Sequence, residues 1–149
     1  MPEGKMNHKF LFEEKEWKLK GTYTDDKGRR TNVTGKTTVL HKFGKWEVDA
    51  EMYVPLKGGK TLDLRNIFNI KPFKKNGFET TWTSDNKIIG KYTGRFFIAG
   101  NIIFSTYSAR NGEYVGHETM EYIGGSKYAG YGKLFHNGDM ESSWKVTLS

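Results

Sequence analysis

Short turn sequences interrupt this chain about every ten to fifteen residues, and the segments between them alternate in side-chain character. The strongest turn signals are Asn-Gly pairs, because both residues accept the positive φ of a type I′ hairpin turn. The nine signals are Asp26-Lys27-Gly28, Phe43-Gly44, Lys57-Gly58-Gly59, Lys75-Asn76-Gly77, Ser84-Asp85-Asn86, Ala99-Gly100, Asn111-Gly112, Gly124-Gly125 and Asn137-Gly138. Alternation between turns is typical of β-strands, and no segment has a convincing 3.6-residue apolar period. The sequence therefore predicts an all-β fold.

The turns divide the chain into ten segments of strand length. We predict strands at 15–24, 30–41, 46–54, 61–70, 78–83, 87–98, 101–109, 114–123, 127–136 and 140–148. A meander of ten hairpin-connected strands has two vulnerable edges, and closing the sheet removes both. We therefore expect a single antiparallel up-and-down barrel of about ten strands. It forms one domain over residues 1–149, in which residues 1–14 are an N-terminal extension and only Pro2 to Glu16 could hold a short helix.

One face of the predicted strands is mainly apolar, and alternate residues of a strand share a face. Hairpin register checks this assignment, because paired residues must lie on the same face. The turns predict the inward pairs Phe96–Ile103, Ser105–Glu118, Glu118–Gly132 and Gly132–Trp144, the first from a turn at Ala99-Gly100 and the last from a three-residue loop. The same alternation places Phe78, Ile88 and Met140 inside. The apolar face is kept in every pair.

The inner face indicates a cavity, because it carries residues that a solid core avoids. Glycines recur at inward positions, and so do polar side chains. The alternative is a wide barrel that bends at its glycines and satisfies the polar groups with buried water. In the cavity interpretation, the predicted ligand-binding residues are Tyr23, Asn66, Trp82, Tyr92, Ser105, Tyr107, Met120 and Trp144.

Glu118 is the candidate catalytic residue. It lies mid-strand between Gly116 and Met120, on the predicted inner face. A carboxylate is costly to bury unless it is paired or protonated, so an apolar cavity should raise its pKa toward the range of a general acid or base. Two alternatives stay open. A one-residue bulge could turn Glu118 outward and His117 inward, or Glu118 could pair with a structural Lys or Tyr.

Several classes of site are not expected. The chain has no cysteine, and its four histidines do not have the spacing of a zinc site, so we predict no metal and no cofactor. An inward histidine that ligates a haem is the one alternative left. The N-terminus has no signal-peptide run and no stretch approaches membrane-spanning length, which predicts a cytoplasmic protein with no membrane partner.

Charge and apolar surface bear on partners. The formal net charge is +7, but acidic residues are interleaved with the cations almost everywhere, so we expect a mixed solvated surface and no nucleic-acid partner. An apolar belt on the outer face is larger than a monomer normally exposes. Its members are Ile89, Phe97, Ile102, Phe104, Val115, Ile123, Tyr131 and Phe135. Either the N-terminal segment covers it or a second subunit does, and we favour a homo-oligomer.

The segment Trp17-Lys18-Leu19-Lys20-Gly21-Thr22-Tyr23 resembles the first strand of calycin-like barrels, the group of lipocalins, fatty-acid-binding proteins and nitrobindin-like barrels. This chain lacks the lipocalin Gly-x-Trp order, and its turn at 25–29 is too short for the helix pair of fatty-acid-binding proteins. An oligomeric barrel with an inward Glu and Asn is also similar in architecture to cyclase barrels of the allene oxide cyclase kind.

These observations predict a barrel that holds a small apolar or aromatic molecule in its lumen. Isomerisation or cyclisation by acid/base chemistry there would make it an enzyme, because such reactions ask for little beyond a dry shaped cavity and one proton-transfer group. The alternatives are a carrier without chemistry and a basic module that binds nucleic acid or an acidic partner.

Overall fold

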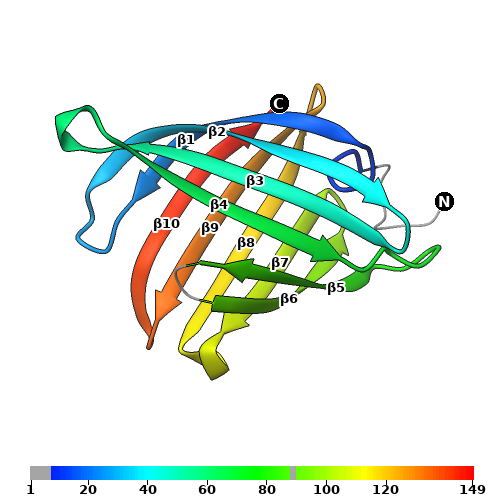
Figure 1. Cartoon of the computed structure of the whole chain (residues 1–149). Helices are drawn as coiled ribbons and strands as arrows, with labels where there is room; N and C mark the ends of the chain where they lie inside the picture. Colours follow the sequence, from blue (N-terminus) through cyan, green and yellow to red (C-terminus); the bar gives the residue numbers. More distant parts are fainter. Residues whose placement is uncertain (1–7, 88–89) are drawn as a thin grey trace.

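The structure, a computed structural model, describes residues 8–87 and 90–149 and is a closed antiparallel barrel (Figure 1). Its ten strands are β1 (Lys15–Thr24), β2 (Arg30–Lys42), β3 (Lys45–Pro55), β4 (Thr61–Ile70), β5 (Glu79–Asn86), β6 (Gly90–Ala99), β7 (Ile102–Ala109), β8 (Tyr114–Gly124), β9 (Lys127–His136) and β10 (Asp139–Leu148). Single 3₁₀ turns occupy Lys57–Gly59 and Arg110–Gly112. Each strand pairs with its sequence neighbours, and β1 pairs with β10 to close the ring. The predicted all-β up-and-down barrel is confirmed.

Most of the predicted register around Glu118 is also confirmed. Glu118 lies opposite Ser105 on β7 and Gly132 on β9, and Gly132 lies opposite Trp144. The predicted Phe96–Ile103 pair is wrong. Phe96 pairs with Ser105 because the β6–β7 turn is formed by residues 100–101 instead of 99–100. The observed register differs from the predicted one by two residues, so every side chain stays on its predicted face.

β5 is longer than predicted. Ser84 to Asn86 continue the strand and pair with β6, so the turn predicted there is wrong, and β6 begins at Gly90 instead of residue 87. The predicted faces of Ile88 and Ile89 lie outside the described residues. Phe78 precedes β5, is 44% exposed and does not face the core as predicted, although its carbonyl accepts a hydrogen bond from the Ile98 amide.

A β-bulge at Glu141 corrects the register of β10. The pairing steps from Met140 opposite Phe135 directly to Ser142 opposite Leu134, so one extra residue is accommodated on β10. Met140 consequently lies on the outer face and is 37% exposed, which makes its predicted inward position wrong. The bulge supplies the residue that we assigned to a longer loop, and Trp144 therefore still faces inward opposite Gly132.

The N-terminal segment closes one end of the barrel. Phe10 and Leu11 are buried in the core, where the Phe10 ring contacts the rings of Trp17 and Tyr128. The described part of the segment, from residue 8, forms turns and no helix. Because it enters the barrel end, these residues do not cover the outer belt, and that alternative is wrong for them.

Two histidines fasten this terminal segment. The His8 ring lies 2.9 Å (Nε2) from the Gly100 carbonyl oxygen and 2.7 Å (Nδ1) from the Tyr128 hydroxyl, and the His41 Nε2 lies 2.7 Å from the Leu11 carbonyl oxygen. Burial lowers the pKa of His8, with a smaller opposing effect from its hydrogen bond to Gly100. A neutral His8 therefore donates from Nε2 and accepts at Nδ1.

The ladder between β4 and β5 is short. Only three residues of β4, from Phe68 to Ile70, pair with β5 among the described residues, and the two strands diverge beyond them (Figure 1). Where the backbone pairing has ended, the Asn86 side-chain amide donates a hydrogen bond of 2.7 Å to the Asn66 side-chain oxygen. This side-chain bond bridges the most open seam of the wall.

No helix among the described residues has the length and hydrophobicity needed to cross a membrane.

Candidate functional site

The barrel encloses a cavity of about 330 Å³, within the range of about 300–1,000 Å³ that is typical of small-molecule sites. Phe10 and Leu11 of the N-terminal segment lie at its closed end, and the walls are mostly aliphatic and aromatic. The cavity extends past the Asn66–Asn86 bridge. It also reaches Glu141, which is exposed at the bulge of β10.

Three inward glycines explain how so many rings leave the lumen open. The Trp82 ring lies against Gly94, the Tyr107 ring against Gly116 and the Trp144 ring against Gly132. A Cβ atom at any of the three would collide with the ring over it. The glycines therefore hold the rings flat against the wall, and the space that remains lies between opposite walls.

Glu118 points into this cavity from the middle of β8. Its Oε2 accepts a hydrogen bond of 2.9 Å from the Trp144 indole N–H, and its side chain is half-buried because the cavity itself leaves part of it accessible. Burial raises the pKa of Glu118, and the Trp144 hydrogen bond opposes that rise. Nearby, the Trp82 indole N–H donates a hydrogen bond of 3.0 Å to the Ser105 hydroxyl. Both indole N–H groups are thus fixed by the residues that β7 and β8 direct inward.

Both structural alternatives for Glu118 are wrong. Pairing is continuous from Tyr114 to Tyr122, so no bulge inverts this part of β8, and His117 is exposed on the outer face. No lysine pairs with Glu118 among the described residues. Tyr107 lies close enough to feel the charge of Glu118: burial raises the pKa of Tyr107 well above the usual value, and the Glu118 charge raises it further.

All nine predicted site residues line this one cavity, although their roles remain predictions. Sequence reasoning missed Asn86, because it was assigned to a turn, and Glu141, because the bulge was not foreseen. It also passed over the rings of Phe68, Phe96 and Tyr114, which line the same space. The alternation placed these three inside, but nothing in the sequence distinguishes a cavity-lining ring from a packed one.

The cavity wall carries no histidine, lysine or arginine among the described residues. His8 and His41 lie at the capped end and His136 at the other, where its ring stacks on Tyr114 and its Nε2 lies 2.9 Å from Glu113. No described group of three His, Asp or Glu side chains could hold a metal ion. The inward histidine that a haem would require is absent from the described wall.

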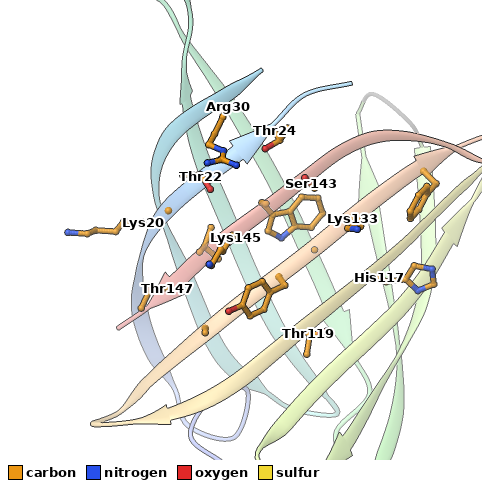
Figure 2. Close-up of a pocket in the computed structure, with 17 residues that line it drawn as sticks. Lys20, Thr22, Thr24, Arg30, His117, Thr119, Lys133, Ser143, Lys145 and Thr147 are labelled. Atoms are coloured by element: carbon orange, nitrogen blue, oxygen red, sulfur yellow. The ribbon is translucent and has the colours of Figure 1, made fainter. Parts of the chain in front are cut away.

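A second hollow, of about 1,080 Å³, lies on the outer surface of β1, β8, β9 and β10 (Figure 2). Lys20, Arg30, Lys133 and Lys145 surround it, and it contains no acidic side chain among the described residues. These four cations make no ion pair there, although the Lys145 ammonium lies 5.7 Å from the centre of the Tyr131 ring. The expected mixed surface is therefore not found on this face.

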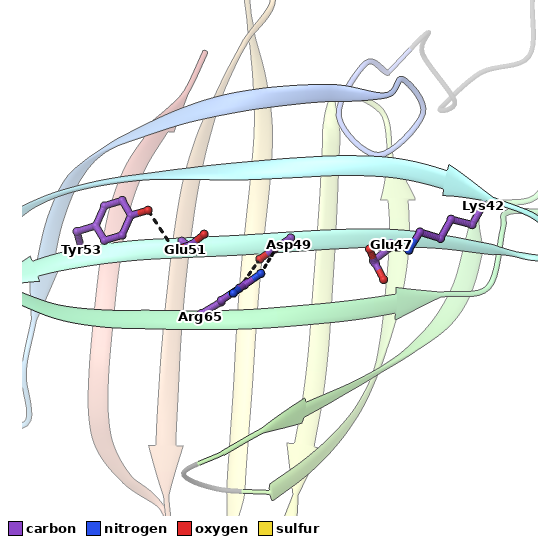
Figure 3. A network of polar contacts seen from close by, with 6 residues as sticks. All are labelled: Lys42, Glu47, Asp49, Glu51, Tyr53 and Arg65. Carbon is purple, nitrogen blue, oxygen red and sulfur yellow. Dashed lines mark hydrogen bonds and ion pairs between the residues drawn. The ribbon is translucent and has the colours of Figure 1, made fainter.

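On the opposite wall, acidic residues line the outer face of β3, beside Arg65 of β4 and Lys42 of β2 (Figure 3). Asp49 forms a two-pronged ion pair with Arg65 at 2.7 and 3.0 Å, and Glu47 pairs with Lys42 at 3.1 Å. Glu51 accepts a hydrogen bond of 3.0 Å from the Tyr53 hydroxyl. Acidic side chains thus lie beside cations on this wall, whereas the hollow on the other wall carries cations without acids among the described residues.

Comparison with known proteins leaves the family open: no protein-family model, curated protein or solved structure matches this chain. The closed ten-stranded barrel is compatible with a calycin-like barrel. The functional argument therefore rests on the geometry of the lumen and of the outer face.

Proposed function

We propose that this barrel binds a small, largely apolar or aromatic molecule in its lumen. The observation that carries the proposal is the enclosed cavity of about 330 Å³, whose aromatic wall holds one carboxyl group, Glu118, in a fixed position. Burial of a carboxyl group without a counter-charge costs stability, whereas replacing such a group with a well-packed apolar side chain often leaves stability unchanged. A ligand that uses both the apolar wall and Glu118 gives this costly arrangement a purpose.

The same carboxyl group separates a carrier from an enzyme. The raised pKa of Glu118 moves this group toward the range in which a carboxyl group can give and take a proton, as isomerisation or cyclisation in the lumen would require. A carrier of a neutral ligand does not need that proton. Glu118→Gln should therefore abolish turnover in an enzyme, whereas a carrier should keep its affinity for a neutral ligand within about threefold.

Filling the lumen tests the binding proposal. Ala50 faces the cavity from β3, whereas Ala99 is exposed on the outer face of β6. The neutral fluorescent probe N-phenyl-1-naphthylamine should brighten when mixed with the wild-type protein and with Ala99→Phe, and should lose most of that response with Ala50→Phe. Equal brightening with the two variants would show that the probe binds outside the lumen. No brightening with the wild-type protein would contradict the binding proposal.

A second candidate function has its own observation, the hollow between Lys20, Arg30, Lys133 and Lys145. Along β9 the outward side chains alternate between cationic and aromatic, as Lys127, Tyr131, Lys133 and Phe135 with one alanine among them. A cationic groove with exposed rings fits single-stranded nucleic acid, whose phosphates and bases it can contact together. Its concave shape fits a strand better than a flat membrane surface.

Salt dependence tests this second candidate. Binding of a fluorescent oligothymidylate that contacts four cations should weaken with salt at a logarithmic slope of about −3. Lys133→Glu with Lys145→Glu should reduce affinity at least tenfold, whereas Lys91→Glu, on the outer face of β6, should change it little. A shallow slope and equal effects of the two sets of substitutions would exclude the groove as a nucleic-acid site.

A further inference from the structure

The lumen holds a carboxyl group with no cation to balance it. Glu118 is the one acidic side chain that faces the cavity centre among the described residues, since Glu51 bonds Tyr53 on the outer face and Glu141 is exposed at the rim. Trp144 occupies only Oε2, and none of the described residues donates a hydrogen bond to Oε1. One carboxylate oxygen is therefore left for a ligand.

Aromatic rings surround the space around this carboxyl group. The Tyr107 ring centre lies 5.5 Å from those of both Trp82 and Tyr92, and Trp144 holds Glu118 from β10. Aromatic faces attract cations, and the attraction strengthens when water is excluded. A carboxylate among aromatic faces is the arrangement that recognises an organic ammonium group.

The same charges disfavour other polar head groups. An anionic ligand such as a fatty acid would bring a second negative charge beside Glu118, with no lysine, arginine or histidine on the described wall to offset it. A neutral ligand would leave the ionised carboxylate without a counter-charge. Only a cationic ligand compensates the desolvation of the ionised Glu118.

We propose that the lumen selects a small arylalkylamine, an aromatic ring that carries a short alkylammonium side chain, with the ammonium group at Glu118 Oε1 and the ring among Trp82, Tyr92 and Tyr107. This inference rests on the proposed function and narrows its ligand class. The size of the cavity, about 330 Å³, limits the ligand to one or two fused rings with a short side chain.

Amine binding should depend on pH in two directions. Burial raises the pKa of Glu118, so an ammonium ligand must draw a proton off this group and should bind more tightly as pH rises through that value. The phenols of Tyr92 and Tyr107, which face the same cavity as Glu118, stay protonated over the pH range of this effect. Burial raises the pKa of Tyr92 to about 12 and that of Tyr107 well above its usual value. Affinity should fall again near pH 10, where an alkylamine loses its proton.

Three probes on one indole scaffold test the inference by calorimetry: tryptamine is cationic, tryptophol neutral and indole-3-acetate anionic. Wild-type protein at pH 8 should bind tryptamine at least tenfold more tightly than tryptophol, and indole-3-acetate most weakly. Glu118→Gln, an isosteric change whose fold circular dichroism can check, should remove the preference for tryptamine and leave tryptophol within about threefold. In the wild type, lowering the pH to 4.5 should weaken the binding of tryptamine and leave the binding of tryptophol unchanged.

The outcomes separate this inference from the proposal beneath it. Equal binding of tryptamine and tryptophol, or a tryptamine preference that survives Glu118→Gln, would overturn the amine inference and leave the ligand-binding lumen standing. Binding of the naphthylamine probe without any indole would do the same. Failure of all four molecules to bind would overturn both proposals.

Discussion

At single positions, the interior depends on glycines that lie under rings. The alternation of side chains places Gly94, Gly116 and Gly132 inside the barrel, and the sequence leaves open whether such glycines make room for a ligand or bend the wall. The structure assigns them to ring contact, and the opening lies between the walls. Sequence reasoning could not settle this point, because the ring over each glycine comes from a neighbouring strand and its rotamer is set by tertiary packing.

Gly132→Ala should be clearly destabilising, by about 1–3 kcal/mol, because the new methyl group collides with the rigid Trp144 ring. Gly130→Ala on the same strand is the matched control. There the nearest atoms are the Met120 sulfur at 2.9 Å, which can move aside, and the Val146 Cγ2 methyl at 3.0 Å, so the loss should be smaller than at Gly132. Urea unfolding should show the difference in the free energy of unfolding, and equal losses in the two variants would argue against the ring contact.

Glu118→Gln should raise the melting temperature at pH 8 by a few degrees. The folded-state pKa of Glu118 is raised, so its ionised form costs stability above that value, and the cost disappears as pH falls to the unfolded pKa near 4.5. The advantage of the glutamine variant should therefore shrink between pH 8 and pH 4.5. A variant that is less stable at pH 8 would make Glu118 a structural residue.

At the level of elements, the strands were predictable and their connections less so. Alternation placed all ten strands, because each buries one face and exposes the other. Two of the errors, at Ser84–Asn86 and at Glu141, affect the site. Ser-Asp-Asn has turn composition but pairs with β6, and the bulge on β10 replaces a loop residue that sequence could not locate. Both errors removed a cavity residue, Asn86 or Glu141, from the predicted site.

The N-terminal segment was predicted as an extension, and its role as the closed end of the lumen was not foreseen. Its attachment should weaken in acid. Burial lowers the folded-state pKa of His8, so its contribution to stability is complete above about pH 6.5 and is lost as pH falls toward the lowered value. The melting temperature of the wild-type protein should therefore fall further between pH 7.5 and pH 5 than that of the His8→Ala variant. Equal losses would show that His8 does not fasten the segment.

At the scale of the whole molecule, barrel closure followed from the edge argument, whereas the separation of charge did not. Lys20, Arg30, Lys133 and Lys145 are far apart in the sequence, and strand pairing and strand order bring them to one hollow. The acidic wall of β3 and β4 and the basic hollow over β8 to β1 are properties of the closed ring. They could not be predicted from the sequence, in which acidic and basic residues are interleaved.

The apolar belt still predicts an oligomer. Phe97 and Phe104 stack on the outer face of β6 and β7, with ring centres 5.0 Å apart, and Tyr131 on β9 is 44% exposed. Sedimentation velocity should show a dimer or trimer that Phe104→Glu converts to a monomer. Phe43→Ser, at the exposed β2–β3 turn, is the control that should leave the assembly intact. A wild-type monomer at all concentrations would refute the oligomer.

The most direct test of the ligand-binding lumen uses the indole N–H signals of the four tryptophans. Trp82 and Trp144 line the cavity and hydrogen-bond Ser105 and Glu118, whereas Trp17 and Trp46 pack near the N-terminal segment and do not line it. A nitrogen–proton NMR titration of the labelled protein with tryptophol should shift the Trp82 and Trp144 signals together and move those of Trp17 and Trp46 far less. Unchanged Trp82 and Trp144 signals, with shifts confined to outer-face amides, would contradict the ligand-binding lumen.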